Sequence, residues 1–221
     1  MTNGIETQSL AKTFANGVVA LSDISISIQR GEFIALVGRS GSGKSTLMNI
    51  LGGLDSPTSG SVSINSRTVD YANRKNLIDI RRTEVGFVFQ QFNLIPSLNA
   101  LENVAYPLLF NYTRREERLQ RALQLLKMVG LGERADHLPH QMSGGEQQRV
   151  AIARAMVGDS SIILADEPTG NLDSKTSSEI YQLMREVNKK NNVTFLIVTH
   201  ERDLASYCDR TIELRDGKVV T

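Results

Sequence analysis

The sequence predicts an α/β fold with a parallel-sheet core, antiparallel strands near the N-terminus and a helical insertion in the middle. Three observations support this prediction. Short apolar, β-prone runs alternate with helical segments in both halves of the chain. A glycine-rich loop joins one of these strands to a helix. The stretch from Leu101 to about Met156 has a helical pattern throughout and interrupts the alternation.

Composition limits the number of domains and the classes of partner. The chain has 221 residues and 40% hydrophobic content, enough for one sizeable core and too little for several independent domains. A net charge of +1 argues against a general nucleic-acid-binding protein. No apolar run approaches membrane-spanning length, and the N-terminus lacks a secretory signal pattern. The single cysteine, Cys208, fits a reducing compartment and is expected to be a small buried hydrophobe.

The N-terminal part is expected to be mainly strands around one helix. Their signals are β-branched content, alternation with period two, and flanking turn residues. The expected strands are Val18–Leu21, Ile24–Ile28, Phe33–Val37, Ser61–Ile64 and Val85–Phe89. The helix follows the glycine-rich loop and includes Thr46–Leu51, and the turn cluster at Asp55–Gly60 ends this unit.

The C-terminal part returns to alternating helices and strands. Amphipathic helices are expected at Arg114–Val129 and Lys175–Asn188, because their apolar residues fall on one face. Buried strands are expected at Ser160–Ala165 and Thr194–Val198. The pair Asp216–Gly217 predicts the turn of a terminal hairpin.

The glycine-rich loop is the strongest functional signal in the chain. Its glycines allow successive backbone N–H groups to face one anion, and the following helix adds its positive end. Lys44 is expected to reach the β- and γ-phosphates of a nucleotide, and the Ser45 hydroxyl to bind Mg²⁺. The candidate nucleotide-binding residues are Gly38, Arg39, Ser40, Gly41, Ser42, Gly43, Lys44, Ser45 and Thr46.

Two carboxylates follow a buried strand later in the chain. Asp166 ends the apolar run Ile162–Ala165 and is predicted to hold Mg²⁺, through water. Glu167, one residue further, is positioned to accept a proton from a water molecule that attacks the γ-phosphate. The alternative is a solvated acidic strand end without a function. It is less favoured than a metal site because the same chain also has a candidate phosphate-binding loop.

Polar residues also follow two other apolar strands. Gln90 comes directly after Val85–Phe89, and His200 follows Thr194–Val198 by two residues. Open α/β sheets bind ligands at the carboxyl ends of their strands, so both are expected near Asp166. Gln90 is predicted to contact Mg²⁺ and the attacking water, and His200 to donate to a γ-phosphate oxygen.

The run Met142–Arg149 has two compatible interpretations. Locally it predicts a capping box, with Ser143 as the N-cap and Glu146 reaching back to it. Glycines at Gly144 and Gly145 are poor helix formers, so something is expected to approach that backbone closely. N–H groups at a helix start together with a serine hydroxyl suit a phosphate.

Taken together, these motifs resemble the nucleotide-binding subunit of an ATP-binding cassette (ABC) transporter over essentially the whole chain. The resemblance implies a P-loop NTPase fold forming one domain over residues 1–221. The core and antiparallel β-subdomain would span about 1–92 and 158–221, and the helical subdomain about 93–157. It implies Mg²⁺-dependent ATP hydrolysis, with Glu167 as catalytic base.

Other site roles follow from the same resemblance. Gln90 would be the Q-loop glutamine and His200 the switch histidine. Phe14 falls where the family has an aromatic residue that stacks on adenine; the alternative is a core phenylalanine. Asp173 belongs to the D-loop, and Ser143, Gly144 and Gly145 to the family signature. In the family two subunits pair head to tail, so these signature residues meet the γ-phosphate held by the other copy.

Within the family, the chain is similar to the lipoprotein-releasing and macrolide-exporter ATPases. It departs from the usual pattern at Arg39, Met142 and Glu146. Met142 conserves volume and apolarity, so function is expected to survive that change. Glu146 instead adds a negative charge beside the expected phosphate site.

The resemblance also implies the partners and the location of the chain. It would form an ATP-dependent dimer with a second copy and dock on a separate integral membrane permease, with no nucleic-acid partner. It would thus lie in the cytoplasm, peripheral to the membrane, with the permease groove near Phe92–Phe110. The runner-up is a soluble ABC-type ATPase not coupled to transport. A GTPase or small-molecule kinase and a non-enzymatic binding module are further alternatives.

Overall fold

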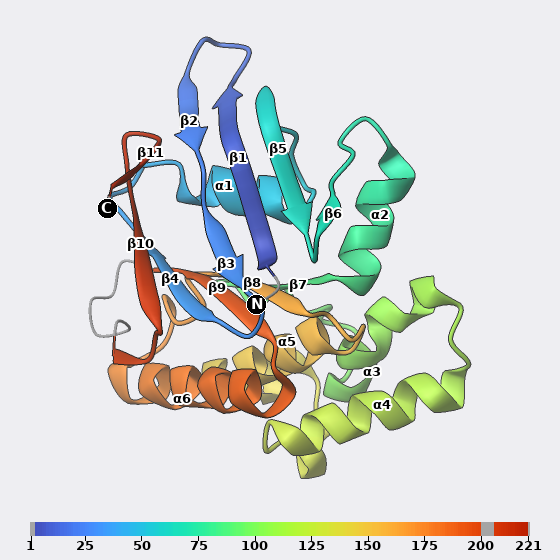
Figure 1. Cartoon of the computed structure of the whole chain (residues 1–221). Helices are drawn as coiled ribbons and strands as arrows, with labels where there is room; N and C mark the ends of the chain where they lie inside the picture. The colour runs from blue at the N-terminus through green and yellow to red at the C-terminus, as the bar shows by residue number, and fades with distance from the viewer. Residues whose placement is uncertain (1–2, 200–205, 221) are drawn as a thin grey trace.

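The computed structural model describes residues 3–199 and 206–220, which form two sheets with helices around them (Figure 1). The first sheet is antiparallel, in the order β2-β1-β5-β6, and β3 also pairs with β1. Its strands are β1 (Asn3–Thr13), β2 (Val19–Ile24), β3 (Ser27–Gln29), β5 (Ser59–Ile64) and β6 (Arg67–Thr68).

The second sheet has the order β11-β10-β4-β9-β8-β7, and only its terminal hairpin is antiparallel. Its strands are β4 (Phe33–Val37), β7 (Val85–Phe89), β8 (Ile162–Asp166), β9 (Thr194–Val198), β10 (Arg210–Arg215) and β11 (Lys218–Val220). Asp216 and Gly217 join β10 to β11 with φ angles of 47° and 74°, as a tight hairpin turn requires. The predicted parallel core and terminal hairpin are confirmed.

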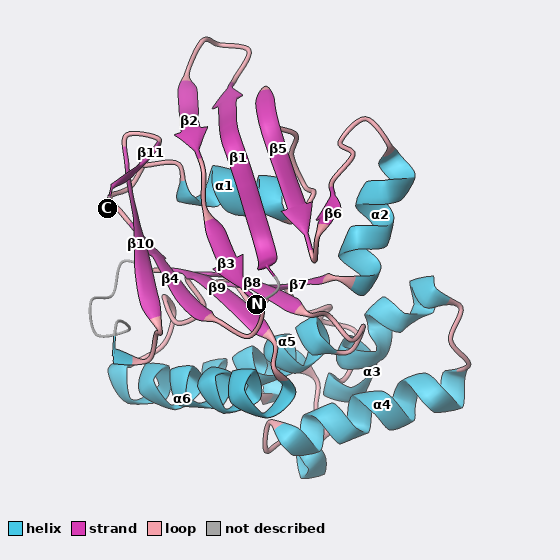
Figure 2. Cartoon of the chain, viewed as in Figure 1, coloured by secondary structure: helices cyan, strands magenta, loops and turns pink. Residues whose placement is uncertain are grey.

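The helices cover both faces of the parallel sheet (Figure 2). Helix α1 lies between the two sheets, whereas α5 and α6 lie against the opposite face. The α-helices are α1 (Lys44–Leu51), α2 (Arg74–Thr83), α3 (Ala100–Ala105), α4 (Arg115–Met128), α5 (Gly144–Met156) and α6 (Ser174–Asn191). Short 3₁₀ turns are η1 (Tyr106–Asn111), η2 (Gly132–Arg134) and η3 (Pro139–Gln141). No helix within the described residues is long and apolar enough to span a membrane.

The central strands divide the core into two clusters. Alternate residues of a strand point to opposite faces, so Phe33 and Ala35 pack with the α5–α6 side, and Ile34 and Leu36 pack with α1. Strands β4, β8 and β9 are buried along nearly their whole length. Burial on both faces explains why these runs are continuously apolar instead of alternating.

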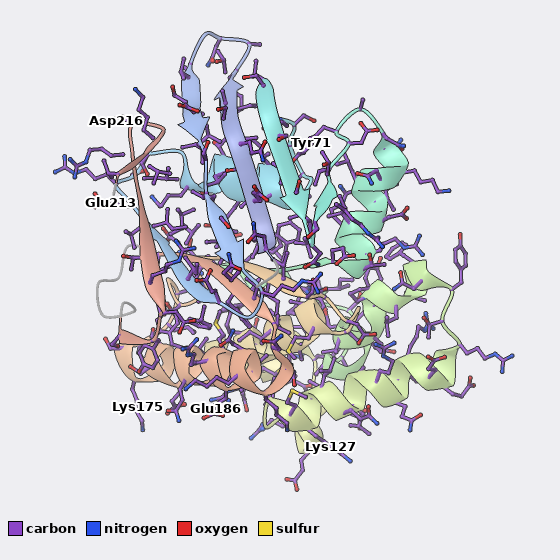
Figure 3. The ribbon with its side chains drawn as sticks, viewed as in Figure 1. Tyr71, Lys127, Lys175, Glu186, Glu213 and Asp216 are labelled. Carbon is purple, nitrogen blue, oxygen red and sulfur yellow. The ribbon has the colours of Figure 1, made fainter. Side chains whose placement is uncertain are left out.

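Charged residues mark the outer surface of the helical layer. Lys127 on α4 and both Lys175 and Glu186 on α6 point away from the sheet (Figure 3). The apolar face of α6 packs inward through Ile180 and Met184, which are fully buried. The predicted amphipathic character of this helix is confirmed.

One predicted strand is divided in two. The sequence favours a continuous strand over Ile24–Ile28, but β2 ends at Ile24 and β3 begins at Ser27. The buried Thr7 hydroxyl donates to the Ile24 carbonyl at 2.9 Å and accepts from the Ile26 N–H at 3.0 Å. At the break, this hydroxyl therefore takes the place of the backbone groups of a neighbouring strand. Nothing in the local sequence of Ile24–Ile28 indicates the break.

Two further elements were not anticipated from the sequence. Strand β1 is rich in polar residues, and its pairing with β2, β3 and β5 stabilises it. Helix α2 is strongly polar overall, and only Ile80 is buried while Leu77 packs partly buried beside it, so its apolar face is narrow. Its one clear sequence signal is Asn73, whose side chain caps the N–H groups of Lys75 and Asn76.

Candidate functional site

The parallel strands bring the predicted site residues to one edge of the sheet. Phe89 pairs with Asp166, and Asp166 pairs with Val198. Leu36, just before the glycine-rich loop, also pairs with Val198. Gln90, Glu167 and the loop therefore leave the sheet at neighbouring strand ends, where α/β folds bind ligands. His200 lies outside the described residues.

The backbone of the glycine-rich loop is compatible only with glycine at several points. Gly38, Gly41 and Gly43 have φ angles of 154°, 79° and 102°. A Cβ atom on Gly43 would lie 2.5 Å from the carbonyl oxygen of Ala20, and one on Gly38 would lie 2.2 Å from that of Leu214. Tight packing and left-handed backbone geometry thus both require glycine here.

Lys44 is held against this loop. Its Nζ donates to the carbonyl oxygens of Gly38 and Arg39, at 2.8 and 2.9 Å. The residue is only 9% exposed. The ammonium therefore sits beside the N–H groups at the start of α1, where a phosphate would gain from both.

A cavity of about 460 Å³ runs along the loop. Phe14 and the start of β2 line one part of it, and Glu167 and Val198 line another. Its loop residues are Gly38, Ser40, Gly41, Gly43, Lys44, Ser45 and Thr46. Arg39 and Ser42 belong to the loop but do not line the cavity. An aromatic ring, the glycine-rich loop with its lysine, and a carboxylate thus meet in one space of a size suited to a small molecule.

Phe14 is a surface residue and not part of the core. Its side chain is among the exposed large hydrophobics, at 41%. The Lys12 ammonium lies 5.2 Å from the ring centroid and is itself fixed by the Asp55 carboxylate at 2.6 Å. The ring is therefore braced by a cation while it lines the cavity.

We expect Phe14→Ala to weaken ADP and ATP binding by about tenfold, because stacking of a base on an aromatic ring contributes about 1–3 kcal/mol. Phe14→Tyr retains the ring face and should bind as the parent does. Phe110→Ala is the matched control, since Phe110 is also exposed but lies outside this cavity. Isothermal titration with both nucleotides measures the change. Equal affinities for Phe14→Ala and the parent would exclude stacking on this ring.

The two adjacent carboxylates have different surroundings. Burial first, and then the negative charge of Glu167, raise the pKa of Asp166, while Lys44 partly opposes this shift. Glu167, but not Asp166, lines the cavity. Glu167 has a left-handed φ of 44°, and its N–H donates to the carbonyl of Val198 at 3.0 Å. A non-glycine residue in this region costs about 1–3 kcal/mol, a strain that is concentrated at functional sites.

Gln90 contacts the segment that follows β8. Its Nε2 donates to the Asn171 side chain at 3.3 Å, and Asn171 donates back to the Gln90 carbonyl at 3.0 Å. Arg154, which sequence reasoning missed, donates to the carbonyls of Phe92 and Asn93. The chain after β7 is therefore held both by this segment and by helix α5.

The start of α5 forms the predicted capping box. The Ser143 hydroxyl accepts from the Glu146 N–H at 3.3 Å, and the Glu146 carboxylate accepts from the Ser143 N–H at 2.8 Å. A Cβ atom on Gly145 would lie 2.6 Å from the Thr176 methyl, and one on Gly144 would lie 3.0 Å from Leu172. A close approach to the backbone was expected at these glycines. Within the chain, the side chains of Leu172 and Thr176 make it.

The residues expected to form the family signature and the D-loop do not line the cavity. Ser143, Gly144, Gly145 and Asp173 are absent from its described lining. Asp173 caps α6 by accepting from the Thr176 hydroxyl at 2.6 Å and from two backbone N–H groups. The Thr176 side chain is the main reason that the pKa of Asp173 is lowered.

Sequence reasoning also missed a buried hydrogen bond between helix α5 and the segment that follows β8. Gln148 is fully buried in α5, and its amide donates to the carbonyl of Pro168, directly after the two carboxylates. The only sequence signal is a polar residue on the buried face of a helix. Met142 is buried, as its apolar character suggested. Cys208 is only partly buried, not fully buried as expected. Removal of the thiol from water raises its pKa to about 11.

The chain resembles known proteins over nearly its whole length. The family model described as "ABC transporter" matches residues 21–170. An uncharacterized ABC transporter ATP-binding protein of Methanocaldococcus jannaschii, MJ0796, is 50% identical, and the alignment covers 97% of this chain and 94% of that protein. The macrolide export ATP-binding/permease protein of Brucella melitensis is 47% identical over 98% of this chain, which spans 34% of that longer protein.

Solved structures agree with this result. A dimeric, post-hydrolysis structure of the MJ0796 cassette, bound to ADP and phosphate, superposes with a TM-score of 0.88 at 47% identity. The match covers 98% of this chain and 97% of that one. The fold and the sequence therefore lead to the same group of proteins.

Proposed function

Because this chain belongs to the ABC transporter family and is an ATPase of that family, we propose that it acts as a head-to-tail dimer with two shared ATP sites. In each site Lys44 and the loop of one copy would bind the triphosphate. Ser143 and Gly145 of the second copy would complete it. ATP binding would close the dimer and hydrolysis would open it.

The observation that carries this proposal is the separation, within one chain, of two elements that are each suited to a phosphate. Lys44 and Ser45 line the cavity, whereas Ser143 and Gly145 do not. A helix start with a serine N-cap suits an anion, yet this helix start does not line the cavity that runs along the loop. A second copy, docked in the opposite sense, brings the two elements together.

The residues at the strand edge fit a divalent cation. A serine hydroxyl, a carboxylate and an amide oxygen are ligands that Mg²⁺ accepts, and Ser45, Asp166 and Gln90 supply them. The paired negative charge of Asp166 and Glu167 favours a cation at this edge. When bound, Mg²⁺ would neutralise charge on the phosphates.

The remaining roles concern the reaction itself. Glu167 would accept the proton of the attacking water, and His200 would donate to the γ-phosphate. Phe14 would stack on adenine. Asp173 would lie near the nucleotide at the dimer interface, at the end of α6 that it caps.

The experiment that tests the proposal is the oligomeric state of the chain with and without ATP. Analytical ultracentrifugation of a hydrolysis-deficient variant should show a monomer without nucleotide and a dimer at saturating ATP. A monomer under both conditions would contradict the shared-site proposal.

We further propose that a membrane permease docks in a groove of about 670 Å³ between the parallel sheet and the helical segment. The groove lies between β7, α2, η1 and the end of α5, close to the Phe92–Phe110 segment expected from the sequence. In that segment Val104 and Leu108 are buried in the core, whereas Tyr106 and Phe110 are exposed. The exposed residues are therefore available for a partner.

The charge of the groove suggests the chemistry of the docking segment. Arg81, Arg82 and Arg154 line it, and each donates to a neutral oxygen of the chain. Among the described ion pairs, none joins these arginines to a carboxylate. A short permease segment with an apolar face and acidic ends would complement both the aromatic and the cationic lining. Such docking would keep the chain at the cytoplasmic face of the membrane.

We expect Phe110→Ala to reduce retention of the chain on vesicles containing its permease by about tenfold, because exposed aromatic anchors dominate such interfaces. The ATPase rate of the isolated chain should stay unchanged. Leu54→Ala is the matched control, since Leu54 is similarly exposed, at 51%, but lies outside the groove. Vesicles of the same lipid without the permease give the background. Unchanged retention of the Phe110 variant would place the permease elsewhere.

A further inference from the structure

We propose that Arg134 and Glu146 form a positioning pair that sets the strength of the phosphate contact made by Ser143. This inference rests on the proposed function, because that contact forms between two copies. Neither residue would touch the nucleotide; both would act through Ser143. Glu146 is also one of the positions where the chain departs from the usual signature.

The Glu146 carboxylate divides its two oxygens between two partners. Its Oε2 accepts from the Ser143 N–H at 2.8 Å and from the Ser143 hydroxyl at 3.0 Å. Its Oε1 lies 3.0 Å from Nε of Arg134. Arg134 ends the short turn η2 between α4 and α5, so the pair ties this connection to the signature.

This arrangement keeps the Ser143 hydroxyl directed at a carboxylate. A hydroxyl has one proton, and in this geometry Glu146 accepts it. To donate to a γ-phosphate, the hydroxyl must turn away from Glu146. The backbone N–H of Ser143 is engaged by the same carboxylate, so Glu146 competes with an anion for both donors.

The charge of Glu146 adds to this competition. The Ser143 backbone N–H lowers the pKa of Glu146 most, and the Ser143 hydroxyl, Arg134 and His137 lower it further. The carboxylate is therefore ionised at neutral pH, beside a helix start that would receive a triphosphate. Arg134 lies close enough to neutralise this charge, although its side chain is 49% exposed. Without Arg134, the γ-phosphate would meet an uncompensated negative charge.

The test measures ATP-dependent dimerisation by analytical ultracentrifugation, with every variant made in a Glu167→Gln chain. Arg134→Gln should weaken the dimer by about fivefold, the upper range for a partly exposed charge interaction. Arg134→Gln combined with Glu146→Gln should return to within about twofold of the parent, because no carboxylate is then left to neutralise. Glu146→Gln alone should strengthen the dimer by about twofold to fivefold.

High salt and a matched control variant distinguish an electrostatic effect on dimerisation from a loss caused by local unfolding. Arg121→Gln removes another ion pair of the helical segment, that with Asp159, and should leave dimerisation unchanged. At 1 M NaCl the Debye length falls to about 3 Å, so the ratio between parent and Arg134→Gln should shrink towards one. A loss caused by local unfolding would persist at high salt.

The outcomes distinguish this inference from the proposed function. A parent that stays monomeric with ATP overturns the proposed function and this inference with it. A parent that dimerises while Arg134→Gln behaves identically overturns this inference alone. The same conclusion follows if the double variant is as weak as Arg134→Gln, or if Glu146→Gln weakens the dimer.

Discussion

Replacing Glu167 with glutamine is expected to lower the rate of ATP hydrolysis by about 10³-fold, within the usual range for loss of a general base. Glutamine has nearly the same shape but cannot accept the proton of an attacking water. The strained φ of 44° is equally available to both side chains, so the cavity should keep its form. ATP should bind as it does to the parent. The dimer should therefore accumulate with ATP and dissociate with ADP.

Phosphate release and size-exclusion chromatography measure the two parts of this expectation. Glu186→Gln is the matched control, because Glu186 lies on the outer face of α6, far from the strand edge (Figure 3). It should hydrolyse ATP at the parent rate. If Glu167→Gln hydrolyses as fast as the parent, another group must act as the base.

The parts of the site that are local in sequence could be predicted. Strand β4, the glycine-rich loop and α1 are consecutive, so one motif predicts both their local fold and a nucleotide site. The same holds for the Ser143–Glu146 capping box, which spans four residues. Because β7, β8 and β9 are short and parallel, the residues after them were also expected at one edge.

The parts that depend on distant contacts could not be predicted. The break between β2 and β3 depends on the Thr7 hydroxyl, which comes from another strand. The glycines of α5 predict a close approach, but not that Leu172 and Thr176, some thirty residues later, are the residues that make it. In the sequence, Arg154 is an ordinary helical residue. Its hydrogen bonds to the carbonyls of Phe92 and Asn93 depend on tertiary structure. Tertiary pairing, not local preference, decides each of these features.

Replacing Lys44 with alanine is expected to weaken ATP binding by about a hundredfold, because a charge-assisted hydrogen bond to phosphate contributes about 1.5–3 kcal/mol. The loss also removes the two bonds that hold the loop carbonyls of Gly38 and Arg39. Lys127→Ala is the control, since Lys127 points outward from α4 (Figure 3). Titration with a non-hydrolysable ATP analogue measures both. Unchanged affinity of Lys44→Ala would remove the loop from the nucleotide site.

The same variant distinguishes a shared site from a self-contained one. Lys44→Ala should stay monomeric at an ATP concentration that saturates only the parent, and Ser143→Arg should stay monomeric because its arginine would block the face that meets the second copy. In a mixture of Lys44→Ala and Ser143→Arg chains, one site of each mixed dimer would combine an intact Lys44 with an intact Ser143. The mixture, with Glu167→Gln in both chains, should therefore regain ATP-dependent dimers that neither variant forms alone. If each chain bound ATP between its own Lys44 and its own Ser143, mixing would restore nothing.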